Sequence, residues 1–166
     1  MIIDCHGHYT TTPPGVAAWR DAQKEAVAAD PDHISSKGVM TVSDDEIRES
    51  IETNQLRVQQ ERGTDVTVFS PRASWMGHHV GNASTSQAWT EHCNDLIRRV
   101  CDPFPTNFVP VCQLPQSPQT PIETSITELR RCVEEMGFIG CNLNPDPSGG
   151  YWKDLPLGDK YWYPLY

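Results

Sequence analysis

The sequence predicts an α/β fold, the N-terminal half of a (β/α)8 barrel with about four parallel strands joined by crossover helices. Strand-like and helix-like segments alternate along the chain, which favours a parallel sheet. The 166 residues also end where a fourth helix should begin, although a typical barrel of this kind needs ~250 residues. A small open four-stranded sheet is the other possibility. We expect residues 1–166 to form one domain, the N-terminal part of a truncated barrel.

Four segments have the composition of strands, and they cover residues 1–5, 65–70, 107–112 and 138–143. The second of them is rich in β-branched residues, as strands usually are. Pro110 lies inside the third segment and lacks a backbone N–H, so the pairing of that strand is expected to be less regular.

Sequence signals mark the ends of the expected helices. One helix covers residues 16–29, and the next begins at a capping box of Ser43 and Glu46 and ends at Gly63. Another helix starts at a second capping box, residues 120–123, with Pro121 at its first position, and runs to Met136. The helix between them carries an apolar stripe at helical spacing, namely Trp89, Cys93, Leu96, Ile97 and Val100.

Composition excludes several classes of function. The net charge of −9 argues against nucleic acid or an anionic membrane as a partner. No apolar run approaches the ~20 residues of a membrane span, and no secretory signal is recognisable. We therefore expect a cytoplasmic protein that acts on a small molecule, and a homo-oligomer is possible.

The cysteines are expected to be free thiols. There are six, their spacing is irregular and no CxxC occurs, which argues against disulfides and against a structural zinc site. Cys5, Cys112 and Cys141 fall on expected strands, and Cys93 and Cys132 fall on helix faces. Buried thiols that act as small apolar side chains account for them best.

The strongest sign of chemistry is the segment from Ile2 to His8. In an extended strand His6 and His8 share a face, about 7 Å apart along the chain, and Gly7 lets the backbone bend where the strand ends. Neutral imidazole is a good ligand for Zn, Fe, Ni and Cu. Two ordinary surface histidines would be the plain alternative. Placement after a buried strand favours a metal-binding pair.

Polar residues also follow the other strands, and parallel sheets bind ligands at the carboxyl ends of strands. Arg72 could clamp a substrate carboxylate through two hydrogen bonds, or be solvated. His78 and His79 cannot point the same way, so we expect one to contact substrate as a donor or proton shuttle while the other packs. Asn142 and Asn144 share a strand face and could orient a substrate, or Asn144 could cap the next turn.

Other catalytic motifs are missing from the sequence, which contains no GxSxG, no P-loop and no GxGxxG. His92 and Cys93 lie on an expected helix away from the strand ends, so we interpret them as structural. A nucleophilic-cysteine enzyme is therefore not expected.

The segment from Ile2 to His8 resembles the first-strand HxH of the amidohydrolase superfamily, in the branch of aminocarboxymuconate-semialdehyde decarboxylase and related enzymes. Residues 70–73, 77–82 and 141–150 look more like the 4-oxalomesaconate hydratase group of that branch, which belongs to protocatechuate degradation. The resemblance covers the whole chain but only about half of such an enzyme.

The resemblance implies a barrel with one divalent metal, usually zinc, held by His6 and His8 and by ligands expected beyond residue 166. It implies hydration of a conjugated double bond in an unsaturated oxo-tricarboxylate, with a water activated by the metal. Arg72, His78, His79, Asn142 and Asn144 would bind this small polycarboxylate.

Two other hypotheses remain open. A metal-dependent decarboxylase or hydrolase on the same barrel would share the HxH and differ in its loops. An inactive fragment that self-associates through its open sheet edges is a third reading, because no third metal ligand follows an expected strand.

Overall fold

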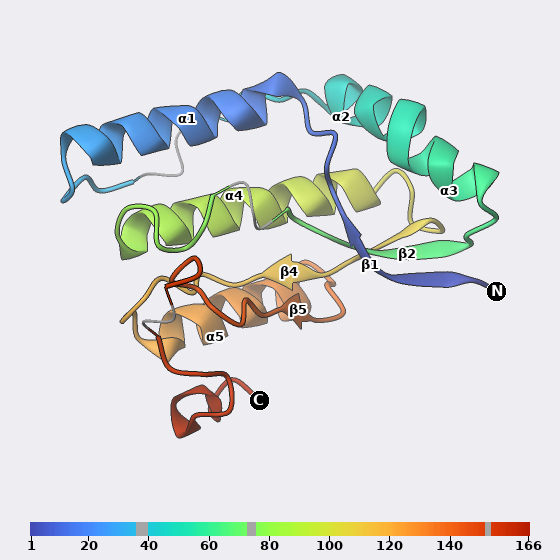
Figure 1. Ribbon diagram of the computed structural model, residues 1–166. Coiled ribbons are helices and arrows are strands. Elements are labelled where there is room, and N and C mark those ends of the chain that lie inside the picture. The colour runs from blue at the N-terminus through green and yellow to red at the C-terminus, as the bar shows by residue number, and fades with distance from the viewer. Residues whose placement is uncertain (36–39, 73–75, 152–153) are drawn as a thin grey trace.

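Parallel strands and crossover helices alternate along the chain in the computed structural model, which describes residues 1–35, 40–72, 76–151 and 154–166 (Figure 1). Ala73, part of one of the family-like segments, lies outside these ranges. The α/β class and the parallel strands expected from the sequence are confirmed, and the strands follow one another in chain order, as in the first half of a barrel.

Three strands form one parallel sheet in the order β1, β2, β3, and two more strands pair beside it. Their bounds are β1 (Ile3–His8), β2 (Val66–Ser70), β3 (Phe108–Pro110), β4 (Cys112–Gln113) and β5 (Cys141–Asn142). The last expected strand, residues 138–143, is therefore regular over only two residues.

The expected strand 107–112 is divided between the two sheets. Pro110 has no N–H for the ladder, and the backbone changes partners beyond it. Val111 N donates to Phe69 O on one side at 2.9 Å, whereas Cys112 N donates to Gly140 O on the other at 3.0 Å. The single segment thus joins β2 to β5, and the prediction of one continuous strand is wrong.

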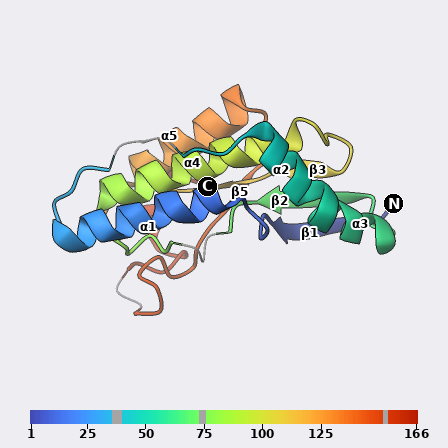
Figure 2. The same ribbon diagram turned by 90° about the horizontal axis from the view of Figure 1, so that it is seen from above.

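The helices lie against the strands as crossovers (Figures 1 and 2). Their bounds are α1 (Pro14–Ala29), α2 (Asp44–Ser50), α3 (Arg57–Glu61), α4 (Ala83–Cys101) and α5 (Ile122–Arg130). Wider turns of the π type continue α2 as η1 (Ile51–Leu56) and α5 as η3 (Arg131–Glu135), and η4 (Lys160–Trp162) is a short 3-10 turn. The helices expected over 16–29, 44–62 and 122–136 are thus present.

The two expected capping boxes differ in outcome. Ser43 Oγ accepts from Glu46 N, and the Glu46 carboxylate accepts from Ser43 N, so the first box is complete. The second is wrong because Pro121 is itself the residue that precedes the helix, and no side chain caps it. Gly63 has a positive φ of 68°, as expected for the residue that follows a helix.

The core lies between α4 and the sheet. All five residues of the expected α4 stripe are buried, and Trp89 stacks on Trp19 of α1 with ring centroids 5.4 Å apart. Phe69 and Phe108 pack against each other in the sheet, with ring centroids 4.8 Å apart. The apolar face of α4 therefore fixes both α1 and the strands.

The first strand differs from the expectation of a buried strand over residues 1–5. It is β1, it includes both histidines, and its residues up to His6 are exposed, with Ile3 at 55%. Its pairing with β2 shifts between Asp4 and Gly7 at an irregularity of the bulge type. Cys5 is exposed as well, while the other five cysteines are free and at least partly buried.

Among the described residues, no helix is long and apolar enough to cross a membrane.

Candidate active site

His6 and His8 lie on the same side of β1, and their imidazole rings meet. The two Nε2 atoms are 3.0 Å apart, and the ring centroids lie 4.5 Å apart in an edge-to-face arrangement. Two nitrogens that each lie about 2.1 Å from one metal ion can be this close. The pair therefore has the geometry of two ligands of a single ion.

Backbone and side-chain acceptors fix the ring of His8. Its Nδ1 lies 3.0 Å from the Pro71 carbonyl oxygen and 2.8 Å from Ser70 Oγ. A carbonyl oxygen only accepts, so Nδ1 carries the proton and Nε2 presents its lone pair toward His6. Partial burial lowers the pKa of His8, and the nearby charges of His6 and Arg72 act in the same direction. A neutral imidazole is the form that binds metal.

Ser70, at the end of β2, connects three neighbouring segments. Its hydroxyl donates to the Gly7 carbonyl at 3.0 Å and accepts from Asn142 Nδ2 at 2.9 Å, while it also contacts His8. Second-layer partners of this kind orient metal-binding histidines in proteins. Sequence reasoning did not select Ser70 as a site residue, although it lies in the family-like segment 70–73, because its contacts come from residues distant in the chain.

A cavity of about 530 Å³ lies at the carboxyl ends of β1, β2, β4 and β5. Four histidines and four amides are among the side chains that line it, namely His6, His8, His78, His79, Gln113, Gln116, Asn142 and Asn144. Another cavity, of about 420 Å³, runs between β1 and α3 and reaches only His8 among these residues. We place the candidate site in the histidine-lined cavity because it contains the His6–His8 pair.

His78 is almost fully buried, at 4% exposed, and is held from two sides. Its Nδ1 lies 2.9 Å from Ser86 Oγ and accepts the backbone N–H of Gln116 at 3.4 Å. Burial lowers the pKa of His78 to about 4, and the charge of neighbouring His79 adds to this effect. His78 is therefore neutral at physiological pH.

His79 is exposed and lies between two glycines. A Cβ at Gly77 would lie 2.6 Å from its Cε1 atom, and a Cβ at Gly149 would meet the same atom from the loop after β5. Tyr151 contacts the ring edge-to-face, with centroids 6.5 Å apart. Glycine at both positions therefore leaves the space that the His79 ring occupies.

Asn142 and Asn144 take different roles. The amide of Asn142 lines the cavity and donates to Ser70, as described above. Both backbone polar atoms of Asn144 pair with the Gln116 side chain, at 2.7 and 3.1 Å. The Asn144 side chain accepts from Asp146 N at 3.1 Å, which is the turn-capping alternative.

Arg72 does not line the histidine-lined cavity. It is exposed, and it borders a small void of about 20 Å³ together with Tyr9 and Trp89. Its charge still reaches His8, as the lowered pKa of that residue shows. The structure therefore places Arg72 beside the site and not within its wall.

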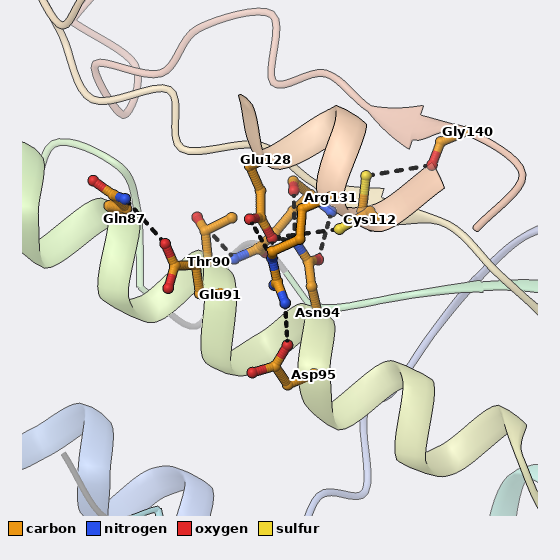
Figure 3. Close-up of polar contacts among 11 residues, drawn as sticks. Gln87, Thr90, Glu91, Asn94, Asp95, Cys112, Glu128, Arg131 and Gly140 are labelled. Atoms are coloured by element: carbon orange, nitrogen blue, oxygen red, sulfur yellow. Dashed lines mark hydrogen bonds and ion pairs between the residues drawn. The ribbon is translucent and has the colours of Figure 1, made fainter. Parts of the chain in front are cut away.

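A polar cluster centred on Asn94, Glu128 and Arg131 lies next to Gln113, which lines the cavity (Figure 3). The Asn94 side chain pairs with both backbone atoms of Gln113, each at 3.0 Å, and donates to Glu128 at 2.7 Å. Arg131 neutralises the buried Glu128 carboxylate with bonds of 2.8 Å and also binds Asp95. Hydrogen bonding to Glu128 raises the pKa of Arg131. This cluster fixes the position of Gln113, a lining residue that we did not select as a candidate.

The metal pair has no third partner in the described part of the chain. Among those residues, no group of three or more His, Cys, Asp or Glu side chains could hold an ion. His78 and His79 line the same cavity without joining such a group. Two histidines therefore fit a metal as part of a larger ligand set.

Two proteins named as hydratases resemble this chain over its whole length. The chain is 56% identical over all 166 residues to a 2-keto-4-carboxy-3-hexenedioate hydratase from Sphingobium sp. strain SYK-6, of which it covers 48%. It is also 48% identical to a 4-oxalomesaconate hydratase from Rhodopseudomonas palustris whose crystal structure is known. The two structures match with a TM-score of 0.88, and the match covers 100% of this chain and 48% of that one. The chain thus spans about half the length of these relatives.

More distant structures share only the fold. A dihydroxybenzoic acid decarboxylase from Polaromonas sp., crystallised with bound manganese, is 21% identical with a TM-score of 0.54, over 87% of this chain and 39% of that one. The family profile described as amidohydrolase matches residues 3–166. Because this match extends over nearly the whole sequence, the chain belongs to the amidohydrolase family.

Proposed function

We propose that the native polypeptide containing these residues is a hydro-lyase that adds water to a conjugated double bond of an unsaturated oxo-tricarboxylate. The observation that carries this proposal is the 56% identity over all 166 residues to a protein named as such a hydratase. The histidine-lined cavity supplies a site of suitable chemistry. On this proposal the protein acts in the degradation of aromatic compounds, by the protocatechuate route, in the cytoplasm.

We further propose that His6 and His8 are two ligands of one divalent ion, with zinc as the first choice. Amidohydrolases generally use a divalent metal, and the paired Nε2 atoms fit two positions around one ion. When bound, the ion would supply Lewis-acid chemistry, because it polarises substrate oxygen atoms and makes water a better nucleophile. Two histidines alone do not complete the coordination of such an ion, so the site requires further ligands.

The other residues of the cavity bind and orient the substrate. Asn142, at the end of β5, and His79, in the loop after β2, present polar groups to the cavity. Arg72 lies beside it and offers a positive charge in a protein of net charge −9. We propose that these groups and Asn144 hold the carboxylates of the substrate, since charge-assisted hydrogen bonds are the strong ones.

The reaction is tested by incubating the native polypeptide, loaded with zinc or manganese, with the unsaturated oxo-tricarboxylate. Loss of the conjugated chromophore with a product mass increased by one water is the expected result. Release of carbon dioxide instead would overturn the hydratase proposal and favour the decarboxylase alternative.

The metal proposal is tested separately by elemental analysis of purified protein. We expect His6→Ala to lower the bound metal strongly. His33→Ala is the control, because His33 lies outside the cavity and uses only backbone atoms in its hydrogen bonds. Equal metal content in both variants would show that the His6–His8 pair is not part of the metal site.

A further inference from the structure

The two ring nitrogens of His78 have different environments. The backbone N–H of Gln116 points at Nδ1, and an amide N–H can only donate, so Nδ1 must be the acceptor. The hydroxyl of Ser86 lies 2.9 Å from the same nitrogen and can donate to it as well. In a neutral ring the single proton is therefore on Nε2.

The protonated nitrogen is available to a ligand. The ring of His78 lines the cavity that His6 and His8 also face. Nδ1 is occupied by two partners, and no hydrogen bond from the described residues engages Nε2. An otherwise buried ring thus keeps one N–H free at the wall of the cavity.

We propose that His78 is a catalytic residue that, as a neutral Nε2–H donor, stabilises the oxygen on which negative charge develops during hydration, and that Ser86 is its positioning residue. This inference rests on the proposed function. It assigns to His78 the role of a hydrogen-bond donor and excludes the role of proton shuttle.

The chemistry requires such a donor. When the water oxygen bonds to the far carbon of the conjugated double bond, the π electron pair shifts toward the carbonyl, whose oxygen becomes an enolate oxygen. Water loses one proton, and the carbon next to the carbonyl gains one, so the atoms balance. A hydrogen bond from a fixed N–H stabilises the enolate without transferring its proton. A buried ring held neutral has the same use in other enzymes.

Kinetics of the native polypeptide test the donor. His78→Phe keeps a flat ring but has no N–H, and we expect kcat to fall by about 100-fold or more with little change in KM. His78→Gln can place an amide N–H near the position of Nε2, and it should recover part of that loss. Equal losses in both variants, or a loss confined to KM, would contradict the assignment.

The positioning role is tested by Ser86→Ala, with Ser125→Ala as a matched control. Both serines are buried, at 2% and 3% exposed, but Ser125 donates to the Pro115 carbonyl and not to His78. We expect only Ser86→Ala to lower kcat, by about 5-fold to 10-fold, and Ser86→Thr to restore it because the hydroxyl returns. Equal effects of the two alanine variants would overturn the positioning role.

A spectroscopic measurement gives an outcome that does not depend on turnover. In 15N-histidine NMR of the unsubstituted polypeptide at pH 7, His78 should show a single proton on Nε2, because the Gln116 N–H requires Nδ1 as its acceptor. A proton on Nδ1, or a doubly protonated ring, would overturn the inference while leaving the proposed function standing. No hydration by the unsubstituted polypeptide would overturn the proposed function, and the inference with it, whatever the tautomer.

Discussion

The side chain of Asn94 in α4 pairs with both the backbone N–H and the backbone carbonyl of Gln113 in β4, each at 3.0 Å. An asparagine side chain thereby takes the place of a neighbouring strand. Because Gln113 lines the histidine cavity, this pairing connects the helix layer directly to the wall of the site.

Asn94→Ala should destabilise the protein strongly. It removes the two bonds to Gln113 and leaves both backbone atoms buried without these partners, so we expect a loss of about 3 kcal/mol in the free energy of unfolding. Urea denaturation measures it. Asn54→Ala is the control, because the Asn54 side chain bonds only within its own helical segment and should cost under about 1 kcal/mol. Similar losses would show that the pairing contributes little.

Arg131→Met should destabilise the protein because Glu128 is only 4% exposed and would keep its charge without its cation. We expect the free energy of unfolding to fall by about 3 kcal/mol or more. Arg57→Met removes an exposed ion pair with Glu61, at 2.7 Å and more than half exposed on both sides, and should change stability by less than about 0.5 kcal/mol. Urea denaturation of both variants measures the two losses in the free energy of unfolding. Equal losses would show that burial of Glu128 does not make its ion pair more important.

Stability should fall at mildly acidic pH because of His78. Its pKa is about 4 in the folded protein and 6.5 in a model peptide, so between these values the unfolded chain binds more protons than the folded one. Neutral His78 therefore contributes up to about 3 kcal/mol to the free energy of unfolding. This contribution is fully present above pH 6.5 and is lost as the pH falls toward 4. Unfolding curves at pH 7, 6 and 5 should show this slope, and His78→Phe should flatten it. An equal slope in the variant would assign the effect to other groups.

Ser70→Ala should weaken metal binding without removing a ligand. The Ser70 hydroxyl lies 2.8 Å from His8 Nδ1 and accepts a hydrogen bond from the Asn142 side chain. Loss of such a partner typically lowers metal affinity by about 10-fold to 100-fold. We expect about 10-fold here, because the Pro71 carbonyl also holds the His8 ring. Chelator competition on the native polypeptide measures the Kd. An unchanged Kd would show that Pro71 alone orients His8.

Gly149→Ala should destabilise the protein more than Gly150→Ala does. Both glycines have a positive φ, 75° and 97°, so each substitution introduces backbone strain of about 1–2 kcal/mol. Only the Cβ at position 149 would also collide with the His79 ring, whereas the Cβ at position 150 meets nothing within 4 Å. We expect the first variant to lose more stability and to raise KM if His79 binds substrate. Indistinguishable variants would contradict the packing of His79 against the loop.

Much of the architecture could be predicted because it depends on local patterns. The α4 stripe repeats at helical spacing and all its members are buried. The Ser43 box formed because Glu46 is three residues away on the same turn. The second box did not form, since Pro121 adopted an extended conformation before the helix. A capping signal in sequence does not fix which residue starts the turn.

The buried face of α5 illustrates what a hydropathy pattern misses. The apolar Val133, in the η3 turns that continue α5, is 41% exposed, while the polar Ser125 and Glu128 are buried. A buried glutamate is unexpected from sequence, because its burial depends on Arg131 and on Asn94 from another helix. Long-range partners of this kind have no signature in a local window.

The sequence by itself determined the alternation of strands and helices and the meeting of His6 with His8, because these follow from spacing along the chain, and its motifs carried the resemblance to the family. Only the tertiary structure decided that the strand is divided between two sheets at Pro110 and that Arg72 lies beside the cavity. It also decided that Ser70 and Pro71 orient His8. The position of the proton on His78 likewise depends on Ser86 and Gln116. Each of these depends on contacts between segments distant in the chain or on burial, and neither is set until the strands and helices have packed.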